Sequence, residues 1–448
     1  MSLKNKYYYK KILIIGFGET GKSVAKFLSA KKCKIFFWDD NNKNNCNKKF
    51  KKIDPKDLEL KYYDFIFVSP GVSRKHFIVK KIIKEGIHIS TDIDLFLYSI
   101  SNLDVKIKLI AVTGTNGKST VAMMIAKALN TKPLGNYGNL VLDNLNKINK
   151  NVVVELSSFQ LDYIHKIRPS ISVITNIKPD HILHHGNFKN YKNAKFNITK
   201  NQKKNDYLIL NYDDLNLRRK YNNKKSEKLK IIWVSNKNTL KNGISFKDKQ
   251  FVDNYFDYKI HELKENIFLK LEHNRLNFCI AFAALKASNI KANTIFKKIL
   301  NFKGLPHRIE FIGKVNKTSF YNDSKATNVA ATCSALESFD KVILIAGGSK
   351  KGESYKPLKR FTNRIFAIFL FGETAEDIGK VFGSASRKYF CKDMNEAVRF
   401  SYKASEFSKK NYPVLLSPAS ASYGLYKNFK KRGEHFKNIF KKLREDAA

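Results

Sequence analysis

The segment TGTNGKST, at residues 113–120, combines glycines, a lysine and hydroxyl side chains in the order that binds phosphate. An apolar run precedes it and a helical pattern follows it, which is the strand, loop and helix order of a phosphate-binding loop. Backbone amides and the helix N-terminus cradle phosphates, the lysine reaches the β- and γ-phosphates, and the next hydroxyl binds Mg²⁺. The predicted nucleotide-binding residues are Gly114, Thr115, Asn116, Gly117, Lys118, Ser119 and Thr120.

The loop departs from the pattern G-x-x-x-x-G-K-[ST] at its first position, where Val112 stands in place of glycine. Gly114 and Gly117 still provide turns, and Lys118 and Ser119 keep the end that contacts phosphate and metal. We therefore interpret the segment as a variant of the loop that still binds ATP.

Two later strands end on candidate metal ligands. The apolar strand at residues 151–155 ends on Glu155, where phosphate-loop folds often place a magnesium-binding acid; the alternative is an acid that faces solvent. The next strand leads to a loop with His181, His184 and His185, a spacing that suggests a transition-metal site. No thiolates or paired acids accompany them in the sequence, so we expect one metal-facing histidine and the others exposed.

The N-terminal segment predicts a second nucleotide-like site. Residues 11–39 follow a strand, glycine turn, helix, strand order, with G-x-G-x-x-G at 16–21 and Asp39 at the end of the second strand. Such glycines admit a diphosphate and such an acid binds ribose hydroxyls, so a dinucleotide and a sugar nucleotide satisfy the pattern equally. A further buried strand leads to the turn Ser69-Pro70-Gly71, where a ligand can meet backbone amides.

The repeated alternation of strands and helices predicts an α/β protein of three domains. We expect a Rossmann-like N-terminal domain at residues 1–102, a central P-loop ATPase domain at 103–303 and a Rossmann-like C-terminal domain at 304–448. The C-terminal sheet should be mostly parallel, with its ligand residues at the carboxyl ends of the strands. Linkers near residues 101–108 and 300–305 are the expected hinges.

Composition limits the partners and the compartment. The 84 Lys and Arg exceed the 39 Asp and Glu by a net charge of +45, but lysines dispersed among asparagines do not favour base readout, which relies on bidentate arginine. We therefore expect no specific nucleic-acid partner. The sequence contains no apolar run of the ~18–20 residues that a membrane helix needs. The five cysteines are scattered, so we expect no disulfide framework and a cytoplasmic protein. We also expect the protein to be a monomer.

Taken together, these motifs resemble the Mur ligase superfamily of ATP-dependent amide ligases, in which the loop lacks its first glycine. The supporting segments span essentially the whole chain: GNYGN (135–139), ELSSFQL (155–161), TNIKPDH (175–181), NAKFNI (193–198), HN (273–274), GLPHRIE (304–310), NDSKATN (322–328) and LLSPASASYGLYKNFKKRGEHF (415–436). The last three are similar to the branch that adds D-glutamate to UDP-N-acetylmuramoyl-L-alanine in peptidoglycan synthesis.

The resemblance implies a reaction through an acyl phosphate, with ATP and two Mg²⁺ ions as cofactors. The implied catalytic residues are Lys118, His181, Lys195 and Lys325, and the implied metal ligands are Ser119, Glu155, His181 and Lys195, the last as a carbamate. The implied ATP contacts beyond the loop are Asn274, Arg308 and Asp323. The implied substrate contacts are Thr20, Asp39, Ser69, Pro70, Gly71 and Asn136 for the sugar nucleotide, and Thr327, Lys351, Ser422 and Phe429 for D-glutamate.

The chain departs from the family pattern at Lys350, where an acid is common, and at Ser420, where a cysteine is common; it also lacks a glycine before His273. Three other interpretations stay open from the sequence. They are another amide ligase such as a folylpolyglutamate synthase, an NAD-dependent dehydrogenase suggested by the G-x-G-x-x-G motif, and a nucleic-acid-binding P-loop ATPase suggested by the charge.

Overall fold

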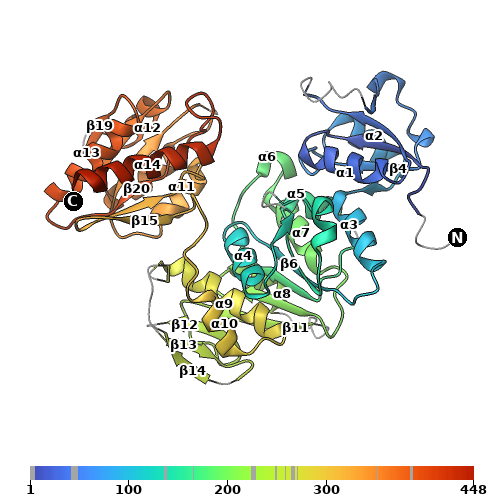
Figure 1. Cartoon of the computed structure of the whole chain (residues 1–448), viewed down its shortest axis with the longest axis horizontal. Coiled ribbons are helices and arrows are strands. Elements are labelled where there is room, and N and C mark those ends of the chain that lie inside the picture. Colours follow the sequence, from blue (N-terminus) through green and yellow to red (C-terminus); the bar gives the residue numbers. More distant parts are fainter. Residues whose placement is uncertain are drawn as a thin grey trace. The chain divides into compact units, whose positions relative to one another are not determined.

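The computed structural model describes residues 6–41, 49–135, 139–164, 166–222, 229–247, 250–257, 259–263, 268–269, 271–350, 352–383 and 387–447. The chain divides into two compact units, Met1–Lys264 with Arg275–Leu300, and Glu265–Asn274 with Asn301–Ala448. The first unit contains an N-terminal and a central sheet, and the second contains a C-terminal sheet (Figure 1). Mostly parallel sheets joined by helices confirm the predicted α/β fold class with three domains. None of the helices in the described ranges has the length and apolar character needed to span a membrane.

The N-terminal sheet is parallel throughout, in the order β3-β2-β1-β4-β5. Its domain contains β1 (Lys11–Ile15), α1 (Glu19–Ser29), β2 (Lys34–Trp38), β3 (Lys51–Lys52), η3 (Pro55–Asp57), η4 (Leu60–Tyr62), β4 (Phe65–Val68), α2 (Phe77–Lys84), β5 (Ile89–Ser90) and α3 (Asp92–Ser101). The central strands are short apolar runs because helices cover parallel sheets on both faces. The carboxyl ends of β1, β2 and β4 therefore form one edge, from which the glycine turn and the Ser69-Pro70-Gly71 turn emerge.

The central sheet has the order β14-β13-β12-β11-β10-β9-β6-β8-β7, and among its described strands only β13 runs opposite to the others, antiparallel to both β12 and β14. Its domain contains β6 (Lys108–Thr113), α4 (Lys118–Ala128), β7 (Leu134–Gly135), η5 (Leu142–Lys147), β8 (Asn151–Glu155), α5 (Ser158–Tyr163), β9 (Ile171–Ile174), α6 (Ile182–His185), α7 (Phe188–Phe196), η6 (Asn197–Thr199), β10 (Tyr207–Asn211), α8 (Leu215–Tyr221), β11 (Lys230–Ser235), β12 (Ile244–Lys247), β13 (Gln250–Asp253), β14 (Lys259–Glu262), α9 (Glu272–Ala287) and α10 (Ala292–Ile299). Strand β6 lies between β8 and β9, so the loops that follow these three strands leave the same edge of the sheet.

The C-terminal sheet has the order β15-β16-β20-β17-β18-β19, with an antiparallel hairpin of β15 and β16 and parallel pairing elsewhere. Its domain contains β15 (Glu310–Val315), β16 (Thr318–Asn322), α11 (Val329–Leu336), β17 (Val342–Gly347), η8 (Lys356–Arg364), β18 (Ile365–Phe371), α12 (Ala375–Val381), β19 (Lys388–Phe390), α13 (Met394–Phe407), β20 (Val414–Leu416) and α14 (Phe429–Asp446). The mostly parallel C-terminal sheet confirms the expectation from the sequence. Apolar residues of this sheet and its helices form two clusters, one for each face.

Candidate active site

The phosphate-binding loop after β6 is bonded to the segment that follows β9. The Thr115 amide donates to the Asn176 carbonyl over 2.8 Å, and the Asn116 amide donates to the Asn176 side-chain oxygen over 2.9 Å. The Thr175 hydroxyl donates to the Asn116 carbonyl over 2.6 Å. Gly114 permits this contact, because its φ is +145° and a Cβ there would collide with the Thr175 side chain. Neighbouring strand ends thus hold the loop in shape.

The loop needs no glycine at Val112, because this residue lies within β6 and its side chain is fully buried. The turn is made later, at Gly117, which caps α4 with a φ of +83°. A Cβ on Gly117 would lie 2.5 Å from the Asn277 side-chain oxygen. Lys118 begins α4, and its amine donates to the Thr115 carbonyl over 2.8 Å. Ser119 and Thr120 follow in the first turn and are buried.

Lys195 is buried against the same loop. It lies near the end of α7, is 2% exposed, and donates its amine to the Gly114 carbonyl over 2.7 Å. Burial lowers the pKa of Lys195 well below the usual value of a lysine, and Lys118 lowers it further, while Asp180 and Glu155 oppose the shift. Compared with a lysine in solvent, Lys195 therefore has a larger share of neutral, nucleophilic amine.

The candidate metal ligands converge at this edge of the central sheet. Glu155 ends β8 and is 1% exposed, and its backbone pairs with Val112 of β6. His181 lies beyond β9, with its Nε2 3.4 Å from Asp180. Burial lowers the pKa of His181; Asp180 opposes this shift, and Lys118 and Lys195 reinforce it, as expected for charged groups that are close together. Carboxylate and hydroxyl oxygens suit Mg²⁺, so the donor set of Glu155 and Ser119 fits that ion.

The expectation that the other two histidines are exposed is wrong. His185 is buried, and its Nε2 lies 3.0 Å from the Ser158 hydroxyl. Its ring stacks on Phe159 with a centroid separation of 5.6 Å. His184 is partly buried, with its ring centroid 4.3 Å from that of Phe159. Phe159 of α5 packs against both histidine rings of α6 and shields them from solvent.

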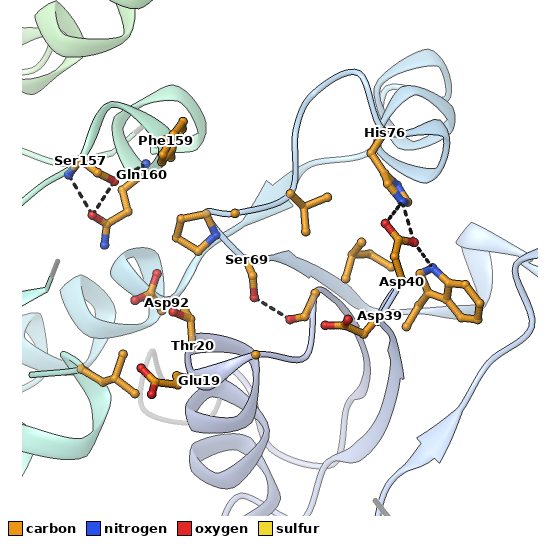
Figure 2. A pocket seen from close by; sticks show the side chains of 18 of the residues that line it. Glu19, Thr20, Asp39, Asp40, Ser69, His76, Asp92, Ser157, Phe159 and Gln160 are labelled. Atoms are coloured by element: carbon orange, nitrogen blue, oxygen red, sulfur yellow. Dashed lines mark hydrogen bonds and ion pairs between the residues drawn. The ribbon is translucent and has the colours of Figure 1, made fainter. Parts of the chain in front are cut away.

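All the predicted residues of the N-terminal domain that bind the sugar nucleotide line one pocket of about 580 Å³ (Figure 2). These are Thr20, Asp39, Ser69, Pro70 and Gly71. The Ser69 hydroxyl donates to the Gly16 carbonyl over 2.6 Å, and the Asp39 carboxylate accepts the Phe17 amide over 2.5 Å. Both side chains therefore hold the glycine turn in place as well as facing the pocket.

Several pocket residues were not identified from the sequence, because their partners are distant along the chain. His76 Nε2 lies 3.1 Å from both oxygens of Asp40, and the Trp38 indole donates to Asp40 over 3.1 Å (Figure 2). Asp92 lines the pocket from α3, and burial raises its pKa to about 7. Phe159 contributes from the central domain. The paired aspartates at residues 39–40 were the available signal.

In the second unit, Asp323 lies at the carboxyl end of β16 and is 4% exposed. It accepts the Ser417 hydroxyl over 2.8 Å and the Ile309 amide over 3.2 Å, and burial raises its pKa to about 7. The Lys325 amide donates to the His307 carbonyl over 3.0 Å, and the Lys325 amine lies 5.5 Å from the centre of the Phe429 ring. The loop after β16 therefore brings Asp323, Lys325 and Phe429 together.

Arg432 of α14 joins this loop to the loop after β20. It is fully buried, and its guanidinium donates to the hydroxyl and carbonyl of Ser324 over 3.1 and 2.9 Å. It also donates to the carbonyls of Ser420 and Ala421 over 3.1 and 3.0 Å. Residue types alone do not single out this arginine, since its acceptors are one serine hydroxyl and three backbone carbonyls, more than ten or more than one hundred positions away.

The remaining predicted residues have varied surroundings. Asn274 is buried and donates to the Phe268 carbonyl over 3.0 Å, Ser422 is buried, and Arg308 and Thr327 are partly exposed. Lys350 is exposed and pairs with Asp377 over 3.0 Å. Asn136 and Lys351 lie outside the described residues. Of the implied ATP contacts, Asn274, Arg308 and Asp323 belong to the second unit, and the loop at residues 113–120 belongs to the first.

Comparison with known proteins gives matches over all three domains. The chain matches the Mur ligase MurD-like N-terminal domain over residues 10–91, the Mur ligase middle domain over 112–285 and the Mur ligase glutamate ligase domain over 307–419. It is 34% identical to a UDP-N-acetylmuramoylalanine–D-glutamate ligase of Rickettsia bellii, over 96% of this chain and 97% of the relative. It is also 34% identical to the ligase of the same name from Clostridioides difficile, over 97% and 99%.

A solved structure of similar fold is the MurF ligase of Thermotoga maritima in complex with ADP. The TM-score is 0.59 with 16% sequence identity, and the match covers 100% of this chain and 98% of that one. At this identity the likeness concerns the fold.

The first prediction concerns Gly114. Replacement of Gly114 by alanine should weaken ATP binding by about 5- to 150-fold, because a Cβ at a φ of +145° strains the backbone by roughly 1–3 kcal/mol and pushes the loop from Thr175. Titration with a fluorescent ATP analogue measures this loss. Gly86→Ala is the control, since it also has a positive φ but open space around its Cβ. Equal ATP affinity in the two variants would contradict the role given to Gly114.

The second prediction concerns Arg432. Arg432→Met should lower the free energy of unfolding by about 2–4 kcal/mol, because it removes the guanidinium donor of the buried Ser324 and Ser420 carbonyls, while the Ala421 carbonyl keeps the Ser349 amide. Urea unfolding followed by circular dichroism measures the effect. The neighbouring Lys431→Met removes only an exposed pair with Glu434 and should change stability by less than about 0.5 kcal/mol. Similar losses in both variants would refute this account.

Proposed function

The chain belongs to the Mur ligase family, and we propose that it is the ATP-dependent ligase that joins D-glutamate to UDP-N-acetylmuramoyl-L-alanine in peptidoglycan precursor synthesis. Two relatives with this activity in their names align over nearly the whole chain. The buried amine of Lys195, bonded to the Gly114 carbonyl, is the observation that supports ligation in addition to ATP binding. A simple nucleotide-binding loop has no need of a second lysine buried at this position.

The reaction must activate a carboxylate, because its oxygen is a poor leaving group. An oxygen of the L-alanyl carboxylate attacks the γ-phosphorus of ATP, the bond to the β-phosphate oxygen breaks, and ADP leaves. The D-glutamate amine then attacks the acyl carbon, phosphate departs with the carboxylate oxygen, and the new amide nitrogen loses its proton. Two anions meet in the first step, so catalysis depends on positive charge held in place beforehand.

The central domain supplies this charge. Lys118 binds the β- and γ-phosphates from the first turn of α4, where the backbone amides and helix N-terminus also favour anions. Two Mg²⁺ ions would be held by Ser119, Glu155, His181 and carbamylated Lys195. Their charge would offset the repulsion between the two reacting anions. In carbamylation the neutral amine, which the lowered pKa of Lys195 favours, attacks the carbon of carbon dioxide and loses a proton. The product is an anionic carbamate with oxygen ligands for a metal.

The N-terminal and C-terminal domains bind the sugar nucleotide and D-glutamate. In the N-terminal domain, assigned to residues 1–102, Thr20, Asp39 and the turn of residues 69–71 bind the uridine diphosphate. Asn136 of the central domain, residues 103–303, contacts the same substrate. The C-terminal domain, residues 304–448, supplies the remaining groups: Arg308 and Asp323 for the nucleotide, Lys325 for the transferred phosphate, and Thr327, Lys351, Ser422 and Phe429 for D-glutamate. Asn274 contacts adenine.

In this function the protein acts in the cytoplasm as a monomer and needs no macromolecular partner. The N-terminal pocket accounts for the G-x-G-x-x-G motif without NAD, because a sugar nucleotide also presents a diphosphate and a ribose.

The third prediction is the product. With ATP, Mg²⁺, UDP-N-acetylmuramoyl-L-alanine and D-glutamate, the protein should release one ADP and one phosphate for each amide formed, measured by coupled ADP assay and mass spectrometry. L-Glutamate should react at least about 100-fold more slowly, because the enantiomer cannot place its amine and both carboxylates on the same polar partners at once. Formation of ADP without a D-glutamate amide would overturn the proposed function.

The fourth prediction concerns Lys195. Lys195→Ala should lower kcat by about 100-fold or more, because it removes a preorganised ligand next to the transferred phosphate. Added acetate or formate should restore part of the activity of this variant by filling the space with a carboxylate. Lys189→Ala is the matched control, since Lys189 is an exposed lysine of the same helix and should leave kcat unchanged. A fully active Lys195→Ala variant would exclude the carbamate role.

A further inference from the structure

Asp162, His184 and His185 converge beside the magnesium site but take no part in the proposed ligation. One potential ligand atom of each lies within 4.8 Å of the other two. Asp162 comes from α5, and the two histidines come from α6. The fold brings the acid Asp162 to the two histidines from about twenty residues earlier in the chain.

The three side chains are held in orientations that leave ligand atoms available. His185 Nε2 lies 3.0 Å from the Ser158 hydroxyl, which leaves Nδ1 for another partner. Asp162 accepts the Arg74 guanidinium on Oδ2 over 3.0 Å, which leaves Oδ1. His184 Nε2 is buried and has no hydrogen-bond partner among the described residues. Contacts of this kind orient the ligands in metal sites, and a buried polar atom without a partner is costly unless something binds it.

The chemistry of the cluster selects the class of ion. Imidazole nitrogens suit Zn²⁺, Co²⁺ and related ions, whereas Mg²⁺ favours oxygen. Two histidines and one carboxylate are the protein ligands of many zinc sites that keep a position for water. Tetrahedral ligands at about 2.1 Å from zinc lie roughly 3.4 Å apart, so separations of at most 4.8 Å need side-chain shifts on the order of 1 Å.

We propose that Asp162, His184 and His185 form a binding site for a divalent transition-metal ion of the Zn²⁺ class, separate from the Mg²⁺ site assigned to His181. The bound ion links α5 to α6, with Arg74 and Ser158 as the groups that orient its ligands. Phe159 covers the histidine rings on one side.

Cobalt titration tests the site independently of ligase activity. Chelator-treated full-length protein in excess Mg²⁺ should bind one equivalent of Co²⁺ with the visible absorption bands of a low-symmetry, nitrogen-ligated ion, and Zn²⁺ should abolish these bands. His184→Asn and Asp162→Asn should lose the bands. Ser158→Ala should weaken Co²⁺ binding by about tenfold, because it releases the His185 ring. His181→Asn and the exposed His88→Asn should keep the wild-type spectrum and stoichiometry.

Two results would overturn the site. One is a wild-type spectrum and stoichiometry in both His184→Asn and Asp162→Asn. The other is loss of the bands in His181→Asn with retention in His184→Asn, which would assign the ion to the magnesium site. Thermal unfolding in metal-free buffer checks that each variant is folded, and His184→Gln replaces His184→Asn if the latter is not. Since the readout is Co²⁺ binding, a failure here leaves the ligase proposal untouched.

Discussion

The central domain must hold two lysine amines against the carbonyls of one short loop. Lys118 donates to the Thr115 carbonyl and Lys195 to the Gly114 carbonyl, so adjacent carbonyls keep both amines at the mouth of the loop. Each amine disfavours the charge of the other, and burial of Lys195 adds to this effect. Hydrogen bonds with Thr175 and Asn176, which follow β9, hold the loop and offset this free-energy cost. Helix α7 positions Lys195 against the loop. The resulting site is stabilised most when anions occupy it.

What the sequence could predict was local. The strand, loop and helix order around residues 113–120, the glycine turn at 16–21 and the apolar strands all arise from neighbours within a few positions, and these elements appear in the structure. The absence of the first glycine from the P-loop also has a local explanation, because Val112 is a strand residue in the core. These features are visible in a single chain because periodicity and turn chemistry act over short distances.

What the sequence could not predict depends on packing between distant segments. The exposure of His185 was misjudged because α5, which buries it, ends more than twenty residues earlier. Asp40 and His76 meet only once β2 and α2 have assembled around the same sheet. In the sequence, only the family resemblance distinguishes Lys195 from the other lysines. Its burial is visible only in the structure. Arg432 makes most of its hydrogen bonds with backbone carbonyls, which leave no trace in residue type.

The outer strands of the sheets affect how readily one molecule can pair with another. Strand β3, at one end of the N-terminal sheet, is only Lys51–Lys52, and β14, at the end of the central sheet, carries Lys259 and Glu262. An open strand edge is a template for pairing with another chain, and short or charged strands oppose it by electrostatic repulsion and by offering few hydrogen bonds. Both effects protect β3 against aggregation, whereas β14, whose Lys259 and Glu262 carry opposite charges, relies on its short length. This protection is independent of any charge needed for catalysis.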